Sequence, residues 1–137
     1  MRLAEGENHL ISERDGLVIC QVWSRPDLST EDGARNAAQL VAFMTNVVLR
    51  AGTQFRGFIF DVRRGPAVFG PKTREAMAGL LLHSVARNVK VAIMCSESAT
   101  QVLQFRSLCT PTPNMTQIFD SEPAAVQWLR STQTPKR

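Results

Sequence analysis

Charged side chains gather at one point of the sequence, where an apolar stretch ends and a helix is expected to begin. Residues 58–62 are apolar apart from Asp61, as in a buried strand, and Arg63 and Arg64 follow directly. Two guanidinium groups beside the free amides of a helix start could bind a phosphate or a carboxylate. The alternative is a solvated loop in which Asp61 pairs with an arginine. The side chains that open the expected helix are Lys72, Thr73 and Arg74.

The loop between this strand and this helix could instead contact a protein. Val68 and Phe69 lie in it among glycines and prolines, and an aromatic side chain in an exposed loop is a typical energetic anchor of a protein interface. Arg63 and Arg64 would then face an acidic patch on the partner. The residues that we assign as partner-binding or anion-binding candidates are Asp61, Arg63, Arg64, Val68, Phe69, Lys72, Thr73 and Arg74.

Cys95 is the best candidate for a catalytic nucleophile. It ends a mostly apolar stretch just before a helix whose amides would favour a thiolate. A phosphate-binding loop of the C-x5-R kind needs an arginine where the chain has Gln101, and the two histidines, His9 and His83, complete no catalytic pattern. We therefore interpret Cys95 as a buried structural cysteine. No catalytic residue, metal ligand or cofactor is assigned, and we expect a protein that is not an enzyme, with a Cys95-dependent activity as the alternative.

The bulk properties are those of a globular chain of 137 residues, with 44% hydrophobic and 20% charged residues. No long apolar run and no signal-peptide pattern occur, so we expect a cytoplasmic protein without a membrane span. Its three cysteines are an odd number at wide spacings, which favours reduced thiols. The net charge of +4 favours anionic partners, but the basic residues are spread along the chain and predict no specific nucleic-acid binding.

Strand and helix patterns alternate along the sequence. Asp15-Gly16 between two apolar runs predicts a β-hairpin over residues 9–23. The order ββαβαβαβα predicts an α/β fold with a mainly parallel central sheet, an N-terminal antiparallel hairpin and helices on its faces. We expect a single domain over residues 1–137, with a core over about 8–131 and loose polar termini. Further strands are expected at 57–62, 89–95 and 116–119, and helices at about 30–51, 71–88, 97–109 and 122–131.

The expected helices carry apolar stripes, marked by Met44, Met77 and Trp128, that we interpret as core rather than as a ligand pocket. In the third helix we expect Leu103 and Phe105 to point inward. Hydroxyl side chains should cap two of the helix starts. These are Ser29 or Thr30 for the first helix and Ser96 or Ser98 for the third.

Two stretches resemble a known family. The strand Gly57-Phe-Ile-Phe-Asp61 and the closing Ile118-Phe-Asp-Ser-Glu-Pro-Ala-Ala-Val-Gln-Trp-Leu129 are similar to the central strand and the terminal helix of the STAS-like or SpoIIAA-like superfamily, which includes anti-sigma-factor antagonists of bacterial partner switching. The resemblance implies a non-catalytic regulatory or scaffolding module of a bacterial signalling pathway that binds another protein. The alternative on the same fold is a sensor of a small anion or of an apolar, lipid-like ligand. The oligomeric state is left open, with a homodimer among the alternatives.

Relatives in this superfamily carry a phosphorylatable serine where the helix after the central strand begins. The matching positions here are Phe69-Gly-Pro-Lys72, and none has a hydroxyl group. Thr73 is the nearest hydroxyl, and we interpret it as an ordinary exposed or capping residue. We therefore predict that serine phosphorylation of the family's kind does not switch this protein.

Overall fold

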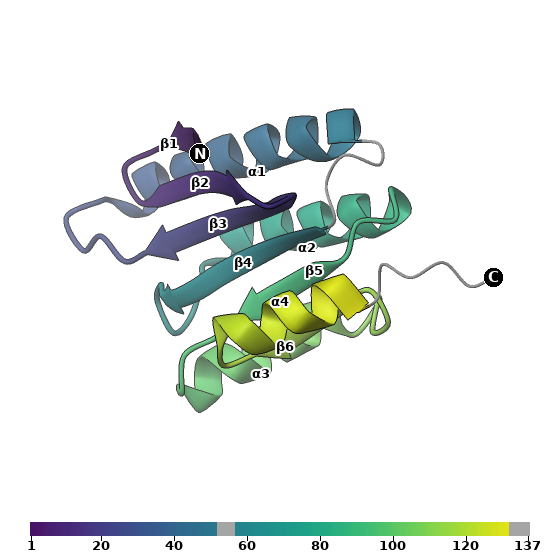
Figure 1. Ribbon diagram of the computed structural model, residues 1–137. Coiled ribbons are helices and arrows are strands. Elements are labelled where there is room, and N and C mark those ends of the chain that lie inside the picture. The colour runs from purple at the N-terminus through teal and green to yellow at the C-terminus, as the bar shows by residue number, and fades with distance from the viewer. Residues whose placement is uncertain (52–56, 132–137) are drawn as a thin grey trace.

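The computed structural model describes residues 1–51 and 57–131 of the chain (Figure 1). The polar tail expected at 132–137 lies outside the described residues. The strands are β1 (Arg2–Glu5), β2 (His9–Arg14), β3 (Leu17–Trp23), β4 (Gly57–Arg64), β5 (Val91–Met94) and β6 (Thr116–Phe119). The helices are α1 (Thr30–Ala51), α2 (Pro71–Ala86), α3 (Ala99–Cys109) and α4 (Glu122–Ser131). None of the helices in the described ranges is long and apolar enough to cross a bilayer.

The strands form one mixed sheet in the order β1-β2-β3-β4-β5-β6. β1, β2 and β3 pair antiparallel, and β3 to β6 pair parallel, which confirms the predicted fold class. The hairpin prediction is also confirmed, because Arg14 pairs with Leu17 around a turn in which Asp15 and Gly16 have φ values of 54° and 82°.

The amino terminus differs from the sequence prediction. Residues 1–7 were expected to be loose, but Arg2–Glu5 forms β1 and pairs with β2, so the order becomes βββαβαβαβα. An irregularity in the pairing between Arg2 and Ala4 lets the neighbouring side chains Leu3 and Ala4 both pack against the larger core. Burial of these two side chains explains why so short and polar a segment is ordered.

The sheet separates two cores of unequal size. Along β4, Phe58, Phe60 and Val62 belong to the larger core, which α1, α2 and α3 cover, while Ile59 belongs to the smaller core under α4. Figure 1 shows α4 alone on the near face and the other helices on the far face. Because side chains alternate along a strand, β4 has apolar residues on both faces, as its sequence predicts.

Serine side chains cap α1 and α3 as predicted. The Ser29 hydroxyl accepts a hydrogen bond from the Asp32 amide at 3.1 Å, and the Ser98 hydroxyl accepts one from the Gln101 amide at 3.3 Å. The inward face of α3 differs from the expected one. Phe105 is buried as expected, but Leu103 is 62% exposed, and Gln101 takes the buried position instead. Positions 101, 105 and 109 are four residues apart and therefore share one helix face.

Gly57 begins β4 in a conformation that fits only glycine. Its φ is 150°, and a Cβ there would lie 2.9 Å from Leu129 Cδ2 and 2.9 Å from the Lys90 carbonyl oxygen. We expect Gly57→Ala to lower the free energy of unfolding by about 1–3 kcal/mol, because the backbone would be strained and α4 displaced. Urea unfolding measures this change. Gly79→Ala is the control, since a Cβ at Gly79 in α2 meets nothing within 4 Å. Equal losses for the two variants would contradict the prediction.

Candidate functional site

Gln101 joins the two loops that follow β4 and β5. Its side chain is fully buried. Its Nε2 donates to the Val62 carbonyl at 2.8 Å and to the Pro66 carbonyl at 3.1 Å, and its Oε1 accepts from the Ser96 amide at 2.7 Å. These hydrogen bonds fix the path from β4 to α2 against the start of α3. At the sequence level, position 101 stood out only as the place where an arginine was missing.

The exposed aromatic anchor predicted at Phe69 is wrong. Phe69 is 6% exposed, and its ring packs edge-on against Phe105 with centroids 5.6 Å apart. Its amide donates to Gln104 Oε1 at 2.9 Å, so α3 holds both its side chain and its backbone. The neighbouring Val68 is 60% exposed and therefore is the apolar side chain that the loop offers to solvent.

A groove of about 880 Å³ opens between α1 and the start of α2, beside the loops that follow β3 and β4. Four of the eight candidate residues line it, namely Val68, Phe69, Lys72 and Thr73. The other four candidates, Asp61, Arg63, Arg64 and Arg74, are not part of its lining. The apolar residues of its wall include Val22, Ala34, Ala37, Leu40, Val41 and Met77. Its size and apolar lining are typical of small-molecule sites.

The groove exists because α1 is thin at its amino-terminal end. Gly33 has no side chain and Ala34 and Ala37 have only methyl groups there, whereas Leu40 and Met44 fill the core one and two turns later. The sequence analysis interpreted the apolar stripe of this helix as core and did not predict the groove. The signal that could have revealed it is the change from small to large residues along one face of the helix.

Asp61 and Arg63 form an ion pair on the face of the sheet that α4 covers, opposite the face that carries the groove. The Asp61 carboxylate accepts from Arg63 Nε at 3.0 Å, from Arg63 Nη2 at 2.9 Å and from the Arg63 amide at 3.1 Å. This confirms the pairing of Asp61 with an arginine, and the hydrogen bond to Asp61 raises the pKa of Arg63. The structure argues against the anion site in which both arginines would bind one phosphate or carboxylate. Arg63 and Arg64 are consecutive strand residues, so their side chains point to opposite faces of the sheet.

Cys95 is 3% exposed at the end of the strand that precedes α3. Burial, and then the nearby Cys109, raise the pKa of its thiol to about 11. A raised pKa is the opposite of what activates a nucleophilic cysteine. Within residues 1–51 and 57–131, no cluster of three or more His, Cys, Asp or Glu side chains is arranged to hold a metal ion.

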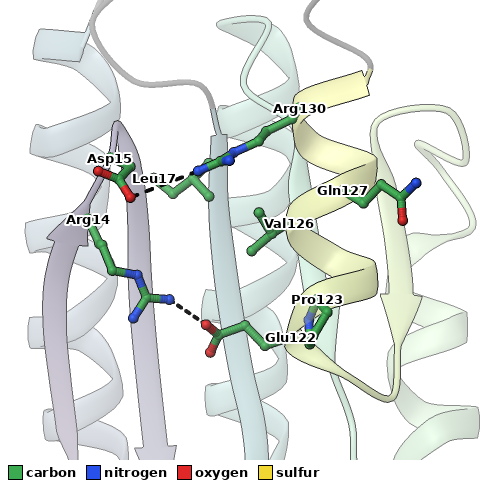
Figure 2. A pocket seen from close by; sticks show the side chains of 8 residues that line it. All are labelled: Arg14, Asp15, Leu17, Glu122, Pro123, Val126, Gln127 and Arg130. Atoms are coloured by element: carbon green, nitrogen blue, oxygen red, sulfur yellow. Dashed lines mark hydrogen bonds and ion pairs between the residues drawn. The ribbon is translucent and has the colours of Figure 1, made fainter.

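A second groove, of about 670 Å³, lies between the β2–β3 turn and α4 (Figure 2). Arg14 pairs with Glu122 at the start of the helix, and Arg130 Nη2 lies 3.9 Å from Asp15 Oδ2 near its end. Leu17 and Val126 line the space between the two pairs. The two cations and two anions that line this groove balance, so it has no excess charge to attract an ion. We interpret the two ion pairs as contacts that hold α4 against the hairpin.

The fold is shared with solved structures. The protein TM1081, determined by NMR, superposes with a TM-score of 0.63 at 15% sequence identity, over 93% of this chain and 94% of that one. An anti-sigma factor antagonist from Mycobacterium paratuberculosis superposes with a TM-score of 0.63 at 13% identity, over 89% of this chain and 92% of that one. No protein-family model and no curated protein sequence matches the chain. The resemblance predicted from the sequence is thus confirmed at the level of the fold.

Proposed function

We propose that this protein is a non-catalytic regulatory module that binds another protein in a cytoplasmic bacterial signalling pathway. The observation that carries the proposal is the fold, which matches that of an anti-sigma factor antagonist over 89% of the chain. The raised pKa of Cys95 supports the non-catalytic part, because the thiol stays protonated at neutral pH. Fold alone does not determine function, so the binding surface must be argued from its side chains.

The surface that we propose for the partner is the end of the sheet where β4 leads into α2. Val68 is exposed there, and Phe69 beneath it is packed into the core, so the apolar contact rests on a rigid support. Arg64, Lys72 and Arg74 are exposed residues of the same segment, from the end of β4 to the first turn of α2. An exposed apolar side chain in a segment with three exposed basic residues suits a partner that has an acidic patch next to an apolar one. Such charge mainly sets the rate and specificity of association.

We further propose that this contact is not controlled by phosphorylation of the family's kind. Gly70 and Pro71 stand at the boundary where α2 begins, and neither offers a hydroxyl group. Thr73 lies within the first turn and is partly buried against the groove. Intact-mass measurement of protein purified from its native cell should show no stoichiometric phosphate on Thr73.

The partner proposal is tested by capture from the native organism followed by affinity measurement with the purified partner. The double variant Arg64→Glu/Arg74→Glu should raise the Kd for the partner by about 10-fold or more, because both side chains would then repel an acidic patch. The matched control is Arg87→Glu/Arg106→Glu, which changes the net charge equally at exposed arginines near the carboxyl ends of α2 and α3. Undiminished binding by the first double variant would overturn the proposed surface.

A further inference from the structure

The groove between α1 and α2 has features of a ligand site that contact with a protein partner does not require. We propose that this groove binds a small amphipathic molecule, with its apolar chain along the groove and a single anionic head group next to Lys72. This inference goes beyond the proposed protein contact and does not depend on it.

The wall of the groove suits an apolar chain. Leu40, Phe69 and Met77 are buried side chains that reach it from α1, from the β4–α2 loop and from α2. Ala34 and Ala37 leave open space in front of them, and a Cβ added at Gly33 would meet nothing within 4 Å. The volume of about 880 Å³ lies within the range of pockets that enclose small ligands.

Both loops that border the groove are held by hydrogen bonds to residues outside its lining, namely Gln101, Asp27 and Glu7. Gln101 fixes the β4–α2 loop by hydrogen bonds to Val62 and Pro66. In the β3–α1 loop, Arg25 donates to the Asp27 carboxylate at 2.7 and 2.6 Å and to the Glu7 carbonyl at 2.9 Å. The groove is therefore formed before a ligand arrives, so binding does not have to order its walls.

The charges on the groove place an anionic head group at the α2 side. Its charged lining residues are Arg25, Glu31 and Lys72. Arg25 is already paired with Asp27, and Glu31 lies in the first turn of α1, where the helix dipole offsets a negative charge. Lys72 makes no ion pair with any described residue, and the first turn of α2 holds no acidic side chain. Lys72 is thus the cation of the lining that is left uncompensated.

Calorimetric titration with dodecanoate at pH 8, below its micellar concentration, tests the proposal on the full chain. We expect one saturable site, and octanoate should bind about 10²-fold more weakly, because each buried methylene contributes about 0.8 kcal/mol, or about 4-fold. Ala37→Leu fills the groove and should weaken dodecanoate binding at least 10-fold. Ala38→Leu is the matched control, since Ala38 is the next residue of α1, exposed and outside the lining. Thermal unfolding checks that both variants are folded.

The head group is tested with dodecylammonium, which has the same chain and the opposite charge. The wild-type protein should prefer dodecanoate about 10-fold or more, and Lys72→Glu should remove or reverse that preference. Arg106→Glu makes the same charge change at an exposed residue of α3 outside the lining and should leave the preference intact. Equal binding of the two amphiphiles by the wild-type protein would overturn the anionic head group.

Three other results would overturn the groove proposal. They are the absence of saturable dodecanoate binding, equal losses in the Ala37→Leu and Ala38→Leu variants, and equal affinities for octanoate and dodecanoate. If Ala37→Leu abolishes binding of the purified protein partner while dodecanoate never binds, the groove is part of the partner surface, and only the ligand proposal fails. If dodecanoate binds as expected and no partner is captured, the ligand proposal stands without the protein contact.

Discussion

Phe105→Ala should lower the free energy of unfolding by about 3–5 kcal/mol, the range for truncating a fully buried aromatic side chain. Phe105 is 0% exposed. Its ring lies edge-on to Phe60 with centroids 6.2 Å apart and edge-on to Phe69 at 5.6 Å, so it connects α3 to β4 and to the β4–α2 loop. Alanine would leave a cavity where these three elements meet, and surrounding elements that are tied to the sheet cannot fully close it.

Urea or guanidinium unfolding of the purified protein measures this loss. Leu103→Ala is the matched control, because Leu103 lies two residues earlier in the same helix and is 62% exposed. Its loss should stay below about 1 kcal/mol, since little apolar surface leaves water there. Phe105→Leu, which keeps most of the buried volume, should fall between the two. A loss for Phe105→Ala no larger than that for Leu103→Ala would mean that the aromatic cluster does not hold α3 in place.

The elements of the fold could be predicted because their signals are local. Asp15-Gly16 supplies the positive φ angles of a tight hairpin turn, and the apolar residues of β4 require cover on both faces. Ser29 and Ser98 mark helix starts by a hydrogen bond that spans three residues. The missed strand β1 has no such signal, because its burial depends on pairing with β2 and on a local irregularity that turns two neighbouring side chains to the core.

The candidate site could be predicted only in part, because its geometry depends on distant residues. Phe69 is an apolar residue in a loop of glycines and prolines. Its sequence neighbours do not reveal that its ring packs against Phe105, 36 positions later in the chain. Arg63 and Arg64 form a cationic pair in the sequence, but continuation of β4 to Arg64 sends them to opposite faces. The groove likewise depends on which part of α1 lies across from the start of α2, and periodicity alone does not give that pairing.

Gln101→Leu should lower the free energy of unfolding by about 2–4 kcal/mol and also loosen the start of α2. Leucine fits a similar volume but removes three hydrogen bonds, to Val62, Pro66 and Ser96. A buried backbone group left without a partner costs about 1–3 kcal/mol. Hydrogen exchange should therefore rise at the Ser96 amide and, because the β4–α2 loop loses its tie, at the Phe69 amide. Denaturant unfolding and amide exchange followed by NMR measure the two effects.

Gln104→Leu is the control that separates this role from the general cost of removing a glutamine. Gln104 lies one helical turn after Gln101, and its Oε1 accepts from the Phe69 amide, but its Nε2 is buried without a partner among the described atoms. Leucine there loses one hydrogen bond and removes one unsatisfied donor, so the two effects oppose each other and the net loss should stay within about 1 kcal/mol. If Gln104→Leu destabilised the protein as much as Gln101→Leu, the three bonds of Gln101 would not be what fixes the loops, and both proposed binding surfaces would lose their rigid support.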